Sequence, residues 1–114
     1  LRSTGPAVIG YHFDGAVRGA SATGLVLGVP TLVEVKFSTS VISVRVGGGT
    51  AATASASPVT PITGALNLGA NWNATAFLQG ILAEPCCAKV AYSAGDTADI
   101  RAAYVNRYGA GVVA

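Results

Sequence analysis

The sequence predicts an all-β fold, an antiparallel β-sandwich that carries one short C-terminal α-helix. Apolar and polar residues alternate over 31–46, which is the period of half-buried strands. Fifteen glycines, together with many Ser and Thr residues, are typical of short strands joined by turns. From residue 96 the pattern changes to that of a helix, with apolar residues four apart.

Length and charge set outer limits on the fold and its partners. We expect a single β-sandwich domain over 1–114, which is either a truncated β-sandwich or the C-terminal part of a longer chain. Seven basic and five acidic residues leave a net charge of +2, and the basic ones are scattered. We therefore expect no nucleic-acid partner. No apolar run approaches the roughly 18–20 residues that cross a bilayer, so no membrane span is expected.

Two strands are predicted near the N-terminus, and a weaker one follows the central hairpin. Residues 7–13, "AVIGYHF", combine β-branched and aromatic letters and precede Asp14-Gly15, a hairpin turn signal. Residues 16–29 continue with weaker strand character, punctuated by glycines. Residues 50–61 are small and polar with two prolines, which indicates a surface excursion or a poorly ordered strand.

The clearest strand signal lies at 31–46, which predicts an antiparallel hairpin with a Ser-Thr turn, closed by the glycines at 47–49. Because successive side chains of a strand point to opposite faces, each strand has one apolar face. That face carries Val33, Val35, Phe37, Ile42, Val44 and Val46. The other face carries Leu32, Glu34, Lys36, Val41, Ser43 and Arg45.

The C-terminal half is predicted to contain three strands and a helix. The strands are expected at 65–70, 77–83 and 86–93, with the loop "NWNAT" at 71–75. Asp96 is expected to cap the N-terminus of the helix, and Asp99 to add negative charge to its first turn. Gly109 is expected to end the helix. Its apolar stripe, which should face the sheets, consists of Ile100, Tyr104 and Tyr108.

A family resemblance rests on the order of motifs over 66–109. The chain has "LGA" (68–70), an aromatic residue before "GILAE" (80–84), then a helix that closes on "YG" (108–109). This order resembles the C-terminal end of concanavalin A-like, LamG-type lectin and glucanase domains. The matching residues are Leu68, Gly69, Ala70, Phe77, Gly80, Ile81, Ala83, Glu84, Tyr92, Asp96, Tyr104, Tyr108 and Gly109. Ser-Thr-Ser at 38–40 departs from the Asn-Gly turn that the family often has in its hairpin.

The resemblance implies a concanavalin-like jelly roll and a place among extracellular lectins, glycan-binding modules or phage fibre and spike proteins. From it we expect a non-catalytic, receptor-binding carbohydrate module at a virion or other extracellular surface. Its partners would be a cell-surface glycan and further chains of the assembly, with a homo-oligomer, such as a trimer, as one form. The alternative is a structural capsid or fibre domain whose role is homo-oligomerisation.

The best candidate ligand site is the loop at 71–75. Trp72 offers an aromatic face for the apolar side of a sugar, and Asn71 and Asn73 offer donors and acceptors for hydroxyls. Packing of Trp72 against the sandwich edge or a neighbouring chain is an equally open interpretation. Tyr11 and Asp14, beside the first predicted turn, form a second candidate.

Catalysis, metal and cofactor binding are not expected. Glycoside hydrolysis needs two carboxylates flanking one bond, and the five acidic residues show no strand-paired spacing. The single histidine, His12, has no "GxSxG" motif or metal-ligand spacing beside it. Cys86 and Cys87 admit a vicinal disulfide, a metal clip or two thiols; we favour two buried thiols in a strand, because Cys packs as a small apolar residue.

Overall fold

The computed structural model describes residues 2–4, 7–13, 17–26, 28–38, 40–55, 81–88, 90 and 92–114. The chain divides into two compact units: residues 1–59 together with 90–114, and residues 60–89. The first unit holds six described strands, one α-helix and one 3-10 helix. In the second unit, residues 81–88 are described.

The first sheet is antiparallel and has the order β1-β2-β3, formed by Arg2–Thr4, Ala7–Phe13 and Val17–Thr23. The register pairs Phe13 with Val17, so β2 and β3 form a hairpin. This confirms the strand predicted at 7–13 and the hairpin that follows it, while the turn residues 14–16 lie outside the described residues. Strand β1 was not predicted from the sequence and is only 3 residues long.

The second sheet has the order β4-β5-β6, formed by Val33–Phe37, Val41–Val46 and Ala52–Ser55. The predicted hairpin is confirmed, with Glu34 paired to Arg45 and Lys36 to Ser43. Ser38 stabilises the turn: its hydroxyl accepts from the Val41 amide at 3.2 Å and donates to the Val41 carbonyl at 3.1 Å. A polar side chain thus takes the place of an Asn-Gly turn.

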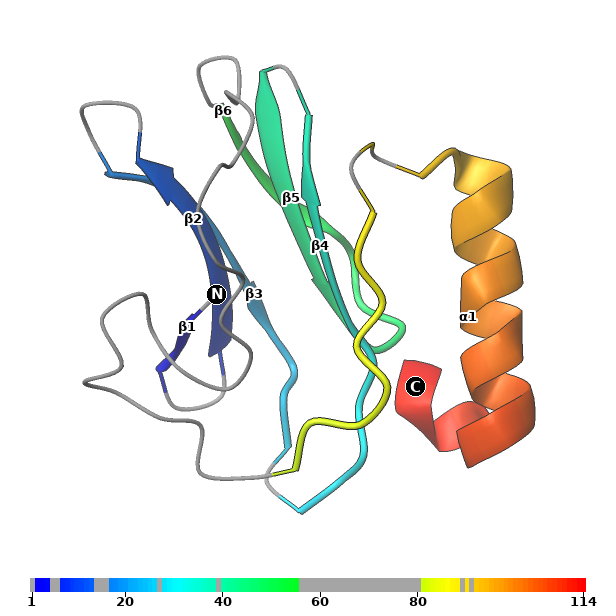
Figure 1. The fold of residues 1–114 in the computed structure, drawn as a ribbon. Coiled ribbons are helices and arrows are strands. Elements are labelled where there is room, and N and C mark those ends of the chain that lie inside the picture. The colour runs from blue at the N-terminus through cyan, green and yellow to red at the C-terminus, as the bar shows by residue number, and fades with distance from the viewer. Residues whose placement is uncertain are drawn as a thin grey trace. The chain divides into compact units, whose positions relative to one another are not determined.

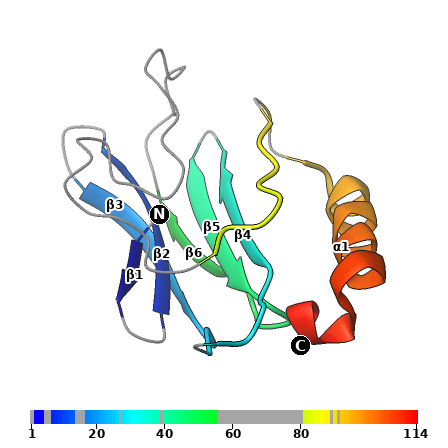
Figure 2. The same cartoon turned by 60° about the horizontal axis from the view of Figure 1, so that its bottom comes forward.

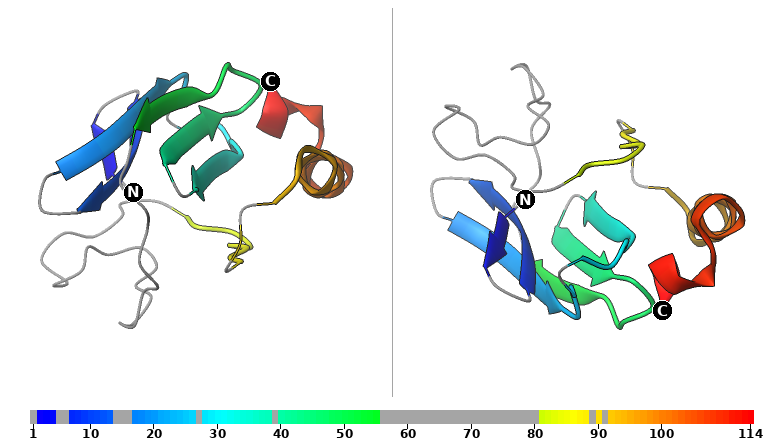
Figure 3. Two further views of the ribbon diagram at one scale, coloured as in Figure 1. Left: turned by 90° about the horizontal axis from the view of Figure 1, so that it is seen from above. Right: turned by 90° about the horizontal axis from the view of Figure 1, so that it is seen from below.

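One hydrophobic core joins the two sheets. It consists of Val8, Ala20 and Ala22 from the first sheet and Ile42, Val44 and Val46 from the second. Strands β2 and β3 pack on β5, and β3 lies beside β6 (Figures 1, 2 and 3). The two sheets can approach each other closely at Gly10 of β2 because this residue has no side chain: a Cβ there would lie 2.7 Å from Val44 Cγ2. The predicted all-β class with one C-terminal helix is therefore confirmed at the level of two antiparallel sheets.

Helix α1 (Ala94–Tyr108) begins with a capping box and ends at a glycine. Ser93 is the N-cap, and its hydroxyl accepts from the Asp96 amide at 3.1 Å while the Asp96 carboxylate accepts from the Ser93 amide at the same distance. The predicted cap at Asp96 was therefore wrong by three residues, because Asp96 is the reciprocal partner at position N3. The predicted end is confirmed: Gly109 has a φ of 88°, which a side chain disfavours. At 15 residues, α1 is too short to cross a membrane, and the described chain has no other helix that could.

The 3-10 helix η1 (Ala110–Val113) returns the chain to the second sheet. The Leu32 amide donates to the Val112 carbonyl at 2.7 Å, and the Gly48 amide donates to the Ala114 carbonyl at 3.1 Å. A Cβ at Gly47 or Gly48 would lie 2.3 Å from a carbonyl oxygen of residue 114 or 113. The glycine run at 47–49 therefore allows this segment to lie directly on the turn after β5.

The strands predicted at 77–83 and 86–93 are wrong over the residues that the structure describes. Residues 81–88 form no strand, and Ile81 is 95% exposed. Glu84 has a φ of 48°, which turns the backbone away from the extended path just before Pro85. Cys86 and Cys87 are exposed thiols, which corrects the prediction that they are buried in a strand. Small apolar side chains become buried only where another part of the fold covers them.

Candidate ligand-binding groove

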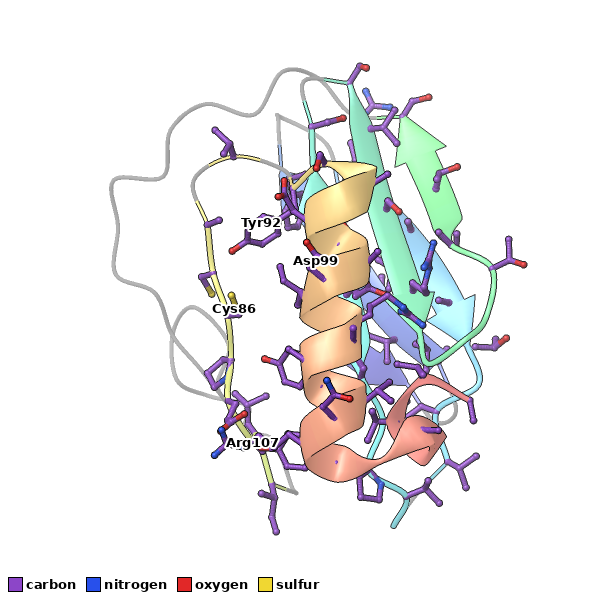
Figure 4. The ribbon with its side chains drawn as sticks, turned by 90° about the vertical axis from the view of Figure 1, so that its right-hand side faces the viewer. Cys86, Tyr92, Asp99 and Arg107 are labelled. Carbon is purple, nitrogen blue, oxygen red and sulfur yellow. The ribbon has the colours of Figure 1, made fainter. Side chains whose placement is uncertain are left out.

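A groove with a volume of about 440 Å³ lies between the first half of α1 and the β4–β5 hairpin. Its lining residues are Lys36, Arg45, Ala94, Thr97, Ala98 and Arg101. All six belong to the first unit of the chain. Figure 4 shows α1 in front of the hairpin, with Asp99 on the side of the helix turned toward the viewer.

Strand alternation brings the polar wall of the groove together. Since Val33 and Val35 pack against the core, Glu34 and Lys36 point to the opposite face of β4. The register then places Arg45 directly across from Glu34 on β5. This confirms the predicted sorting of the hairpin into an apolar and a polar face.

Helix α1 covers that polar face with residues one turn apart. Thr97 and Arg101 are at i and i+4, so they lie on the same side of the helix. Asp99 follows Thr97 by two residues and is exposed on the opposite side. The helix therefore meets the sheet through Thr97, which is only 9% exposed, and through the Arg101 side chain.

Arg101 fastens the helix to the hairpin. Its Nη1 donates to Glu34 Oε2, and its Nη2 donates to the Gly47 carbonyl oxygen at 2.8 Å. The two charged side chains are 17% and 16% exposed, so the pair is largely removed from solvent. Charge-assisted bonds of this kind are stronger than neutral ones, and their loss leaves a desolvated charge. Arg101 consequently has a structural role in forming the groove.

Lys36 makes the second link between sheet and helix. Its Nζ donates to Thr97 Oγ1 at 2.7 Å, and Thr97 Oγ1 in turn donates to the Ser93 carbonyl oxygen at 2.8 Å. An ammonium group has three donors, and the hydroxyl of Thr97 carries no charge. Thr97 thus takes one of the three donors of Lys36 and brings no counter-charge to the groove wall.

Arg45 is more accessible than Arg101, the other guanidinium of the groove. Its Nε lies 3.9 Å from Glu34 Oε2, which is an ion-pair distance but too long for a hydrogen bond. The Arg45 side chain is 38% exposed, against 16% for Glu34. Glu34 is thus held mainly by Arg101, and the guanidinium of Arg45 can donate to a bound molecule.

The start of α1, where Ala94 lines the groove, is held by an ionised carboxylate. Hydrogen bonds from the Ser93 side chain, and then from its backbone amide, lower the pKa of Asp96 below the ordinary 3.8, and desolvation opposes the shift. Asp96 is therefore charged at neutral pH, which favours the positive end of the helix dipole.

The groove differs from the sites predicted from sequence. Asn71, Trp72, Asn73 and Asp14 lie outside the described residues. Tyr11 lies in β2, where its backbone pairs with Gly19, and its side chain is outside the description as well. The structure therefore leaves those sites as predictions and adds the groove. Alternation sorted Lys36 and Arg45 to the polar face of their own strands, the register brings the two faces together, and no local signal showed that a helix covers them.

The predicted apolar stripe of the helix does not explain how α1 docks. Tyr104 and Tyr108 stack on each other, with ring centroids 6.2 Å apart and an interplanar angle of 19°. Tyr108 is 42% exposed, while the hydrogen bonds to the sheet come from Thr97 and Arg101. Polar contacts, in addition to apolar ones, therefore position the helix.

Comparison of the chain with protein-family models, curated proteins and solved structures finds no match in any of the three. The resemblance to concanavalin A-like domains accordingly stays a prediction from the motif order. Among the described residues, no three His, Cys, Asp or Glu side chains gather closely enough to hold a metal ion.

Proposed function

We propose that this chain is a non-catalytic binding module that holds a cell-surface carbohydrate in the groove between α1 and the β4–β5 hairpin. The observation that supports it is an open, donor-rich groove of about 440 Å³. This volume lies within the range of about 300–1,000 Å³ that is usual for ligand pockets. Saccharides suit such a groove because each ring presents hydroxyls and an apolar C–H face.

Binding without catalysis fits the charges of the groove. None of the six described lining residues is acidic, and the carboxylate in contact with them, Glu34, accepts from Arg101. Glycoside hydrolysis needs an acid and a second carboxylate about 5–10 Å apart across the scissile bond. Glu34 is bound by Arg101 and has no second carboxylate across the groove among the described lining residues, so it meets neither requirement. A role in positioning Arg101 and Arg45 is the better assignment.

The setting and the finer fold belong to the same proposal. We place the module on a phage fibre, spike or other extracellular assembly, at the virion or extracellular surface, as a homo-oligomer such as a trimer. The two sheets around one core would form part of a concanavalin-like jelly roll. The low share of charged residues, 11% of the chain, suits packing against other copies of the assembly.

Glycan-array binding of the folded chain tests this proposal. We expect Arg45→Ala and Lys36→Ala to weaken binding, and Arg18→Ala, which removes one exposed charge from β3 in the other sheet, to leave it unchanged. Trp72→Ala provides the comparison with the loop predicted from sequence. A chain that binds no glycan of the array contradicts the proposal, and loss of binding only with Trp72→Ala moves the site to that loop.

A structural capsid or fibre domain is the second candidate, and exposed apolar side chains favour it. Val26 is 58% exposed, Val29 49% and Phe37 40%. Apolar surface of this kind is commonly covered at subunit contacts. Sedimentation equilibrium distinguishes the two functions: a stable trimer without glycan binding favours the structural role, and a monomer that binds glycan excludes it.

A further inference from the structure

The groove holds more positive than negative charge. Lys36, Arg45 and Arg101 are lining residues, and Glu34 is the carboxylate in contact with them. Because Arg101 donates to Glu34 and to the Gly47 carbonyl, its charge is already compensated. Lys36 and Arg45 carry the remaining positive charge, because Lys36 donates to a neutral hydroxyl and Arg45 is 3.9 Å from a carboxylate that already accepts from Arg101. Asp96, the nearest acidic residue of the helix start, is hydrogen-bonded to Ser93.

Lys36 is held in a setting that suits an anion. Its residue is half-buried, and its hydrogen-bond partner is the neutral hydroxyl of Thr97. A partly desolvated ammonium gains most from a nearby negative charge, because solvent screens the pair less than it would at an exposed site. Arg45, on the neighbouring strand and the same face of the sheet, adds a planar guanidinium that can donate two parallel bonds to a carboxylate.

The helix side of the groove carries two alanines beside Thr97 and Arg101. Ala94 and Ala98 are one helical turn apart and both line the groove. Their methyl groups add C–H surface to a groove whose sheet side carries Lys36 and Arg45. A molecule that fits both walls has an anionic group on one side and C–H groups on the other. A sugar ring bearing a carboxylate has that arrangement.

We infer that the groove recognises an acidic saccharide, with Lys36 and Arg45 binding the carboxylate of a sugar acid and Ala94 and Ala98 contacting its ring. This inference rests on the proposed function and names the ligand class for the same site. Arg101 acts as a positioning residue, because its contacts are with Glu34 and Gly47 and hold α1 over the hairpin.

The test compares matched pairs of saccharides by titration calorimetry with the whole chain. The acids are oligomers of galacturonate, glucuronate, mannuronate and N-acetylneuraminate, and each is paired with its methyl ester, which keeps the ring and removes the charge. We expect at least one acid to bind about tenfold or more tightly than its ester. The affinity for that acid should fall as salt rises from about 0.05 to about 0.5 M, because salt screens its two charged contacts. Sulfated dextran provides a sulfate arm, and is expected to bind no better than the acid.

Variants locate the effect in the groove. Arg45→Gln removes a charge whose closest carboxylate contact is 3.9 Å away, so it is expected to keep the fold while the preference for acid over ester falls about tenfold. Arg45→Lys keeps the charge but not the planar donor pair, and an intermediate loss is expected. Arg18→Ala is the matched control on β3, with unchanged preference expected.

Each result has a defined meaning. Equal affinity for every acid and its ester overturns the inference, and neutral glycans that bind the array would then leave the proposed function standing. The absence of binding to any saccharide, charged or neutral, overturns both. An acid preference that survives Arg45→Gln and Lys36→Ala, in variants shown by circular dichroism to be folded, overturns the assignment of these two residues. Sulfated dextran that binds more tightly than every carboxylate overturns the choice of a sugar acid as the ligand.

Discussion

Gly10→Ala should destabilise the fold by separating the two sheets. A Cβ at this buried position would lie 2.7 Å from Val44 Cγ2 and 2.9 Å from Val35 Cγ1. Carbon atoms pack best at about 3.5–4.0 Å, so both contacts are too short by at least about 0.6 Å. Overpacking of this kind costs about 1–3 kcal/mol. For a chain of this length the expected fall in Tm is about 4–12 °C, at about 4 °C per kcal/mol.

Thermal and urea unfolding followed by circular dichroism measure this change, and two further variants test its cause. Gly111→Ala is the matched control, because its Cβ would meet nothing within 4 Å and no positive φ opposes it. It should leave Tm unchanged or raise it slightly. In a Val44→Ala background the added methyl occupies the space left by the valine, so Gly10→Ala should cost less than half as much. An unchanged Tm for Gly10→Ala, or an equal cost in both backgrounds, would refute the close contact between β2 and β5.

Two predictions concern α1. Arg101→Ala should release the helix from the hairpin, raising amide hydrogen exchange over α1 and lowering the free energy of unfolding by about 1–3 kcal/mol. Asn106→Ala, at an exposed position in the last turn, should change the free energy of unfolding by less than about 0.5 kcal/mol. Comparable effects of the two variants would contradict the role given to Arg101. Because the folded pKa of Asp96 is lowered, its stabilisation is complete above the ordinary 3.8 and is lost as pH falls through the folded value. Helical circular dichroism should therefore decline in acid more steeply for the natural chain than for Asp96→Asn, and parallel acid titrations would disprove this.

The elements predicted correctly are those whose signals are local. Alternation sorted the hairpin at 31–46 because a strand has a period of two whatever lies on either side of it. Gly109 marked the end of α1 because a left-handed φ needs a residue without a Cβ. The start of the helix was misplaced even though Ser93 stands three residues before Asp96, since either residue can cap and only the backbone conformation at Ser93 distinguishes them.

The elements predicted incorrectly are those that need a distant partner. Residues 81–88 have strand-like letters, but a strand requires a neighbour to pair with, and Glu84 at a φ of 48° breaks the extended path. The prediction that Cys86 and Cys87 are buried was wrong for the same reason, because an apolar residue type does not specify which part of the fold covers it.

Alternation predicted the polar faces that carry Glu34, Lys36 and Arg45 in their two strands, and the register of the hairpin places these residues on one face. What turns that face into a site is the docking of α1, which brings Thr97 to Lys36 across 61 residues of chain and Arg101 to Glu34 across 67. No local pattern encodes such a contact, because its free energy arises only when both elements are folded and the charges they bury are paired.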